Sequence, residues 1–381
     1  MGPNSILRPV LLPTDLVGRP APCDLFSAGG LLLLRAGSPI VGGRQDPSQP
    51  LRFHCPAPFA ARICHANPTR DLARIANGLE ALAQRLSGGA GVPANELQEL
   101  ARKLVEVWRF DPDACLGFAR LSRYSRASVR HVVHVGLLAL EVGTATGIGH
   151  DGLTALAGAA LSMNLTRLAL HDEMFNLRGF PDSVQRQAIH DHPLESTALL
   201  HRVGHGCEEW IPAVVSHHEN IDGSGYPLRL KGAAIPLPAR ILRVADTLAA
   251  RISGRKTRAP LYWNLSHANA PALLARHVFG DDLALLDKSL INQLMRVLGP
   301  FPPGCLIRLS NRELAVVTRR GLGGPTKPRQ VLAVADPAGH LLEMPILRKL
   351  GNGLLAIRAY AQDESSRLET HAWHEMWGYD R

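Results

Sequence analysis

The chain has 381 residues, of which 46% are hydrophobic and 20% are charged; this length and composition fit a globular protein of about two or three domains and exclude a disordered chain. The formal net charge is +9, which suits a phosphate-bearing ligand, an acidic partner or simply a basic surface. Because basic residues are scattered and aromatic residues make up only 5%, we expect no nucleic-acid groove.

The first predicted elements belong to a β-rich module over residues 1–66. Prolines and glycines surround short apolar runs there, and the stretch from Asp24 to Leu34, with Ala28-Gly29-Gly30 at its centre, is typical of a β-hairpin. A helical connector follows over residues 67–120. Its first helix begins with Thr69 as the expected N-cap and stops at Gly88-Gly89, and its second runs from Ala94 to Arg109.

The largest predicted unit is a helical domain over residues 121–298, where apolar residues recur at helical spacing. Residues 299–350 are predicted to form a β extension, with a hairpin of Leu306–Leu309 and Leu314–Val317 and a third strand at Val331–Val334. Residues 351–381 form a tail, where we expect a terminal helix packed through Trp373 and Trp377. The fold class is therefore mainly α, a helical bundle flanked by small β-rich N- and C-terminal regions.

Cysteine usage and the N-terminus both indicate a cytoplasmic protein. The six cysteines show no C-x-x-C spacing, which disfavours a disulfide scaffold or a zinc knuckle. The N-terminus lacks the basic and apolar regions of a signal peptide, and the longest apolar runs fall far short of the roughly 20 residues that span a bilayer. We therefore expect no membrane span.

The densest group of polar residues begins with His217-His218-Glu219 and continues from Asp222 to Pro227. Adjacent histidines point about 100° apart on a helix, so both reach one cation only where the helix ends at a site; a surface pair is the alternative. His192 lies upstream, and Asp246 lies downstream on a largely apolar helix. A buried carboxylate needs a partner, and a metal held by three histidines and this carboxylate meets that need.

Further motifs follow in the same order: Leu230-Lys231-Gly232, Ile235-Pro236-Leu237 and Arg240-Ile241. Over about residues 120–260 the chain thereby resembles the HD-GYP family of bacterial cyclic di-GMP phosphodiesterases. The resemblance implies an HD-superfamily helical bundle. It also implies five metal ligands, two cationic residues that stabilise charge on the substrate phosphate, and a loop that similar domains present to diguanylate-cyclase partners. The ligands are His131, His192, His217, His218 and Asp246; the cations are Arg167 and Lys231; the loop residues are Asp222, Gly223, Gly225, Tyr226 and Pro227.

This chain departs from the family at the defining His-Asp pair, which binds and bridges two metals. Met163 and Asn164 stand at those positions. A shared carboxylate keeps two cations close, whereas an Asn amide is neutral and Met is a soft ligand. The first metal then retains at most His131 and Asp246, so we do not expect a two-metal site. His192, His217 and His218 suffice for one Fe, Mn or Zn ion, although satisfied relic histidines are an equal alternative.

Two other His-Asp pairs do not match the family register. His171-Asp172 falls eight residues after the expected position, where the family has a loop, and His190-Asp191 abuts the already matched His192. We interpret neither as the missing motif.

These residues favour a degenerate HD-GYP protein of cyclic di-GMP signalling, which acts as a regulator or ligand sensor with impaired or absent phosphodiesterase activity. One alternative is an active metal-dependent phosphodiesterase, in which a metal-bound water attacks phosphorus. A second is an adaptor that binds a diguanylate-cyclase-type partner and no nucleotide. The expected partners are therefore cyclic di-GMP or a related nucleotide, or such a protein.

Overall fold

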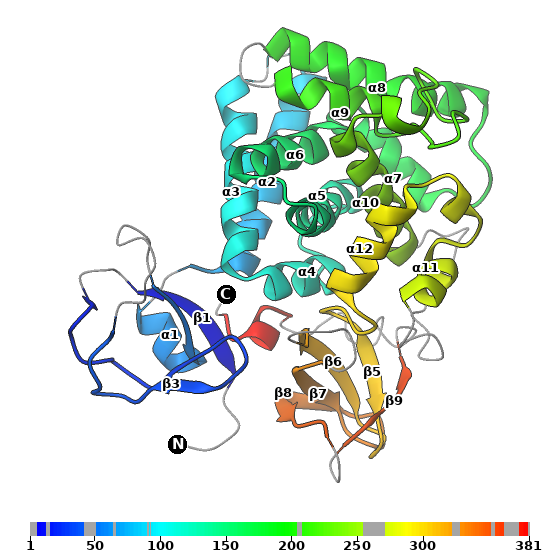
Figure 1. The fold of residues 1–381 in the computed structure, drawn as a ribbon. Coiled ribbons are helices and arrows are strands. Elements are labelled where there is room, and N and C mark those ends of the chain that lie inside the picture. Colours follow the sequence, from blue (N-terminus) through cyan, green and yellow to red (C-terminus); the bar gives the residue numbers. More distant parts are fainter. Residues whose placement is uncertain are drawn as a thin grey trace.

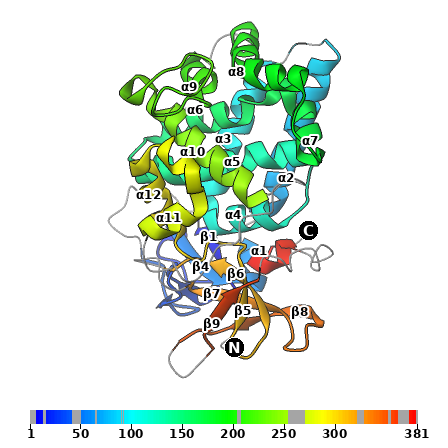
Figure 2. The same ribbon diagram turned by 90° about the vertical axis from the view of Figure 1, so that its right-hand side faces the viewer.

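The computed structural model describes residues 6–12, 16–41, 51–63, 66–89, 91, 93–203, 208–253, 271–321, 328–351, 355–361 and 373–379. Its helices form one large body, and two small sheets lie at the other end of the molecule (Figure 1). The turned view shows both sheets on the same side of the helices (Figure 2). The expected class, a mainly α bundle flanked by β-rich terminal regions, is confirmed.

The N-terminal sheet is antiparallel, with the strand order β1-β4-β2-β3. Val10, Leu12, Leu25 and Cys55 form its own small core. Leu25 pairs with Leu34, which confirms the predicted hairpin. The strands are β1 (Leu7–Leu12), β2 (Leu25–Phe26), β3 (Leu32–Leu34) and β4 (Leu51–Pro56), and helix α1 (Ala57–Ile63) follows them.

The helical body is built around one central helix, α5 (Ala127–Ala145), which Figure 1 shows nearly end-on among its neighbours. Nearly every residue of α5 is buried, so its sequence is apolar on all sides. The surrounding elements are α2 (Pro68–Ser87), α3 (Ala94–Phe110), α4 (Pro112–Leu121), α6 (His150–Ser162), η2 (Leu165–Arg167), α7 (Leu168–Asn176), α8 (Ser183–Val203), η3 (Glu208–Trp210), α9 (Ile211–Ser216), η4 (Gly232–Ala234), α10 (Leu237–Ser253), α11 (Pro271–Phe279), η6 (Gly280–Ala284) and α12 (Lys288–Leu298).

The two predicted connector helices are present as α2 and α3, but the expected cap of α2 is wrong. Asn67 is the N-cap, because its side-chain oxygen accepts the N–H of Arg70. Thr69 lies inside the helix and donates its hydroxyl to the same Asn67 oxygen. An asparagine before a proline at the first helical turn is a stronger start signal than a threonine two residues later.

The C-terminal sheet is antiparallel, with the order β8-β7-β6-β5-β9. Its central strands coincide with the three predicted ones, while the two edge strands lack a clear apolar alternation and were not predicted. The strands are β5 (Leu306–Leu309), β6 (Leu314–Arg319), β7 (Gln330–Ala335), β8 (Leu341–Arg348) and β9 (Ile357–Tyr360). The tail contributes η8 (Trp373–Trp377), in which Trp377 is buried and donates to the carbonyl of Thr318, confirming the expected packing.

Buried ion pairs fasten this sheet to the helical body. Asp111, the N-cap of α4, pairs with the two terminal guanidinium nitrogens of Arg319, Nη1 and Nη2. It also accepts a hydrogen bond from the Tyr379 hydroxyl, whose oxygen lies 2.7 Å from Oδ2 of Asp111. Arg320 next to it pairs with Asp113 and Glu141. Because Asp111, Arg319, Glu141 and Tyr379 are almost fully buried, the junction has one defined geometry.

Only one described helical stretch, His150–Asn176, is long and apolar enough to qualify as a membrane span by length and composition. Two thirds of its window is buried inside the fold. It packs as α6, η2 and α7 around α5, which is the pattern of a core helix.

Candidate metal centre

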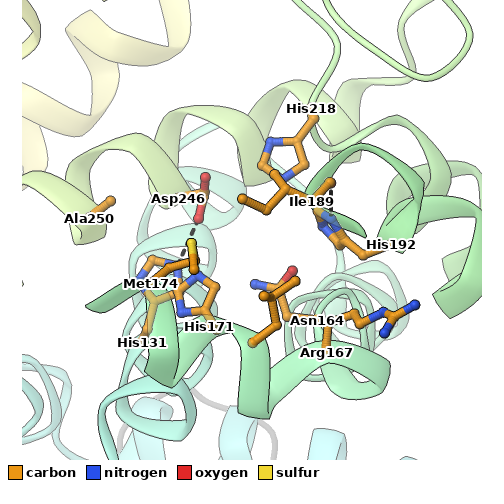
Figure 3. A pocket seen from close by; sticks show the side chains of 11 residues that line it. His131, Asn164, Arg167, His171, Met174, Ile189, His192, His218, Asp246 and Ala250 are labelled. Carbon is orange, nitrogen blue, oxygen red and sulfur yellow. Dashed lines mark hydrogen bonds and ion pairs between the residues drawn. The ribbon is translucent and has the colours of Figure 1, made fainter. Parts of the chain in front are cut away.

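A cavity of about 130 Å³ lies where α5, η2, α7, α8 and α10 meet the segment after α9 (Figure 3). Imidazoles, one carboxylate and one amide converge on it among apolar side chains. Its lining is His131, Asn164, Arg167, Leu170, His171, Met174, Ile189, His192, His218, Asp246 and Ala250. Four of the five predicted ligands line this cavity, and the fifth, His217, is fully buried directly behind His192 and His218.

Three of the histidines form a cluster able to hold a metal ion. His192, His217 and His218 each offer a ring nitrogen, and these nitrogens all lie within 4.8 Å of one another. Although His192 comes from α8 and the other two from the end of α9, the structure brings them together as predicted from the sequence. His217 follows the last residue of its helix, so the chain turns there and both adjacent rings reach the same place.

The hydrogen bonds of this cluster determine which nitrogens are available. Nδ1 of His192 lies 2.6 Å from the carbonyl oxygen of Ile189, and Nδ1 of His217 lies 2.6 Å from that of Val214. A carbonyl only accepts, so each Nδ1 carries the proton. Burial lowers the pKa of both rings, that of His217 to about 3, so each Nε2 presents a lone pair.

These two Nε2 atoms face each other at 3.1 Å. Two lone pairs at this distance repel unless a cation lies between or beside them. Neighbouring nitrogen ligands at the usual 2.0–2.1 Å from a zinc ion are themselves about 3.0–3.4 Å apart. The arrangement therefore fits adjacent positions in a metal's coordination sphere, and the backbone carbonyls orient the rings as partners of metal-bound histidines do.

His131 and Asp246 pair with each other across the cavity. Nε2 of His131 on α5 lies 2.8 Å from Oδ1 of Asp246 on α10, as the dashed line in Figure 3 shows. Burial opposes ionisation of the Asp246 carboxyl, but the His131 hydrogen bond and nearby positive charge hold its pKa well below the usual range. Each of these two predicted ligands thus already has a partner.

The positions of the missing His-Asp pair differ from each other. Met163 ends α6, is fully buried in the hydrophobic core and is absent from the cavity lining. Asn164 projects into the cavity between the His131 and His192 sides (Figure 3), and in the described part of the chain its side-chain amide makes no hydrogen bond. The position that faces the cavity is therefore neutral.

Neither predicted cation points into the cavity. Arg167 borders it, but Figure 3 shows its guanidinium directed away from Asp246, and it pairs with Glu195 through Nε at 2.6 Å and through Nη2. The hydrogen bonds and charge of Glu195 raise the pKa of Arg167 further. Lys231 is exposed beside Gly223 and does not line the cavity.

The two His-Asp pairs that do not match the family register have different surroundings in the structure. The chain at His171-Asp172 continues as α7, where a loop was expected from the resemblance, because η2 leads directly into this helix. His171 lines the cavity and stacks on His131, with ring centroids 4.8 Å apart, a role that the sequence did not indicate. Asp172 instead accepts the backbone N–H and hydroxyl of Ser128 in the first turn of α5, and Asp191 is paired with Gln187 at the surface. Neither acid lines the cavity.

The loop from Glu219 to Pro227 supports His218 from outside. The ring of Tyr226 lies between those of His218 and His190, with centroid distances of 4.8 and 4.9 Å, and its N–H donates to the carbonyl of His218. Asp222 accepts the N–H and hydroxyl of Ser224, so it closes the turn. The buried Glu219 accepts the N–H groups of Leu228 and Leu230.

Gly223 and Gly225 serve this loop in different ways. Gly223 has a φ of +87°, a left-handed conformation that glycine adopts at little cost. Gly225 packs against the backbone of the segment that carries His218, so close that no side chain fits. The two glycines therefore shape the loop that braces the histidine cluster.

Comparison with known proteins agrees with this geometry. A family model described as an HD domain matches residues 118–269. A cyclic di-GMP phosphodiesterase of Pseudomonas aeruginosa is 27% identical over 207 residues, which cover 54% of this chain and 48% of that protein. The cyclic di-GMP phosphodiesterase response regulator RpfG of Xanthomonas campestris is 27% identical over 206 residues, which cover 52% of this chain and 51% of that protein. A 3'3'-cGAMP-specific phosphodiesterase of Vibrio cholerae is 30% identical over 142 residues, which cover 37% of this chain and 32% of that protein.

The chain thus spans about half or less of the length of these curated relatives. Among solved structures, an HDG"Y"P protein from Bdellovibrio bacteriovorus aligns with a TM-score of 0.47 and 15% identity over 76% of this chain and 98% of that one. A family model for the HD domain therefore covers residues 118–269, and the chain is similar in sequence to bacterial cyclic di-GMP phosphodiesterases.

Proposed function

We propose that this chain is a degenerate HD-GYP protein of bacterial cyclic di-GMP signalling, a ligand sensor or regulator with impaired or absent phosphodiesterase activity. The observation that carries the proposal is the side chain of Asn164, a neutral amide that projects into the cavity where its relatives' chemistry needs an acid. Among the described residues, Asp246 is the single carboxylate lining that cavity, and it is already paired with His131.

The charge in the cavity decides how many cations it can hold. Two divalent ions a few ångströms apart repel strongly unless a shared anion neutralises them, as a bridging carboxylate does. Here one carboxylate faces the cavity, among imidazoles that supply no negative charge. A pair of ions is therefore poorly compensated.

The three-histidine cluster is suited to one divalent ion, Zn, Fe or Mn. The facing Nε2 atoms of His192 and His217, together with His218, would hold this ion. The loop from Glu219 to Pro227 would keep His218 in place through Tyr226. When bound, such an ion polarises a phosphate oxygen and lowers the pKa of water. The residues themselves bind and orient the ion.

The surroundings favour binding over turnover. Arg167, which would contact the phosphate, is held by Glu195, so a nucleotide competes with that carboxylate for it. The cavity volume of about 130 Å³ is below the roughly 300–1,000 Å³ of sites that enclose small ligands. A cyclic dinucleotide would then lie across the mouth, with one phosphate directed inward.

The test combines metal analysis, turnover and calorimetry on the full chain. We expect about one metal ion per chain, binding of cyclic di-GMP, and no hydrolysis with Mn or Fe. The Asn164→Asp variant should bind more metal, because it restores an acid without disturbing the core around Met163. Two ions per chain, or hydrolysis lost in His217→Ala, would establish an active enzyme instead. If the metal-bound chain gives no heat with cyclic di-GMP, the remaining alternative is an adaptor that contacts its partner protein through the Asp222–Pro227 loop.

A further inference from the structure

A second pocket lies in the C-terminal sheet, far from the histidine cluster. Its volume is about 670 Å³, and it is formed by the β5–β6 turn, the β7–β8 turn and β9. Three arginines line it, Arg308, Arg312 and Arg358, together with Ser310 and the backbone of Ala338-Gly339. It shares no lining residue with the cavity at the histidine cluster, and its sheet lies at the opposite end of the molecule from α8 and α9 (Figure 1).

Among the described residues, the charged side chains that line this pocket are all arginines. No Asp or Glu lines it, and Arg312 and Arg358 form no ion pair within the part of the chain that the structure describes. Arg308 donates from Nη1 to the carbonyl of Arg312 at 2.9 Å, which fixes it against the turn. A concave surface lined by like charges concentrates anions.

The acids of the adjoining turns are engaged elsewhere. Asp336 accepts the backbone N–H groups of Ala338 and His340 and also contacts the His340 ring. Glu313 forms a two-point pair with Arg348. Neither carboxylate forms an ion pair with Arg312 or Arg358.

The backbone at Arg312 gives an independent indication. Its φ is +72°, in the left-handed region where most side chains cost about 1 kcal/mol or more and glycine costs little. A glycine would build this tight turn more favourably. Arg312 instead lines the pocket at the expense of local strain, and such strain is characteristic of binding sites.

We propose that this pocket binds a phosphate-bearing small molecule of nucleotide size. Guanidinium groups match phosphate oxygens with paired hydrogen bonds, and those of Arg312 and Arg358 around one concavity suit a di- or triphosphate better than a single carboxylate. The volume lies within the range of small-molecule sites. The C-terminal sheet is then a second ligand-binding region that does not depend on the metal or on the HD cavity.

The experiment is calorimetry of the full chain at physiological salt with pyrophosphate, GTP and a short DNA duplex as probes. We expect GTP and pyrophosphate to bind, and Arg312→Gly and Arg358→Ala each to weaken them about tenfold or more, because each removes a charged hydrogen-bond donor. Arg312→Gly also relieves the positive φ, so folding is not at risk. His217→Ala should bind both probes like the unaltered chain.

Arg229→Gly is the matched control, because Arg229 also has a positive φ, +54°, and lies outside the pocket. The inference is wrong if neither phosphate compound binds, or if Arg229→Gly weakens binding as much as Arg312→Gly. Tighter binding of the DNA duplex than of GTP would also overturn it, because the site would then be a nucleic-acid surface.

Discussion

The close contact at Gly225 makes a sharp prediction about the loop that braces His218. A Cβ added at Gly225 would lie 2.3 Å from the nitrogen of Asn220, 2.5 Å from Cα of Glu219 and 2.6 Å from the oxygen of His218. Carbon contacts in well-packed proteins begin near 3.5 Å, so the backbone must move apart by about 1 Å. Because all three atoms belong to the main chain, no rotamer change relieves the overlap. We expect Gly225→Ala to lower the free energy of unfolding by about 1–3 kcal/mol.

The same displacement should weaken metal binding. The movement separates Tyr226 from His218, so that the N–H to carbonyl hydrogen bond and the ring stack are lost. Loss of groups that orient a metal-binding histidine typically weakens metal affinity about 10–100-fold. Zinc affinity, measured by competition with a chelating dye, should fall by that factor, while the other two histidines keep residual binding.

Gly179→Ala is the matched control, since no heavy atom lies within 4 Å of the added methyl group and Gly179 has no positive φ. Urea unfolding and the zinc titration are compared for the three proteins. If Gly225→Ala matches Gly179→Ala in both measurements, the loop tolerates the methyl group and its bracing of His218 is refuted.

Three further predictions concern stability. Asp111→Asn leaves Arg319 charged and buried without its partner, so urea unfolding should show a loss of about 3–5 kcal/mol, whereas Arg74→Ala, which removes an exposed pair, should stay within about 0.5 kcal/mol. Burial and the nearby Arg319 lower the pKa of His54 to about 4. The unfolded chain therefore takes up a proton first as the pH falls, and stability is lost between about pH 6.5 and 4. His54→Gln should reduce that pH slope by up to about 1.4 kcal/mol per pH unit, and an unchanged slope would contradict the assignment. Zinc at about 100 times its dissociation constant should stabilise the unaltered chain by about 2.7 kcal/mol in thermal or urea unfolding; His217→Ala should show little of this gain, and an equal gain would place the ion elsewhere.

Much of the local structure was predictable because it depends on residues close together in sequence. Apolar spacing indicated α2 and α3, and short apolar runs around turn residues indicated β5, β6 and β7. The edge strands β8 and β9 escaped prediction because they lie half exposed, so no alternation marks them. The cap at Asn67 was missed although an asparagine directly before a proline is a strong sequence signal for the start of a helix.

For the site, the sequence alone identified the residues that compose it. Resemblance to the HD-GYP family predicted that His192, His217, His218 and Asp246 converge, and the same resemblance identified Asn164 as the position of the missing acid. Only the tertiary structure decided the pairings: Arg167 with Glu195, Asp172 with the first turn of α5, and Asp111 with Arg319, 208 positions away. The reason is physical. Periodicity reports which face of an element is buried, whereas a charged or polar side chain chooses its partner from whatever the packing of distant elements places within reach.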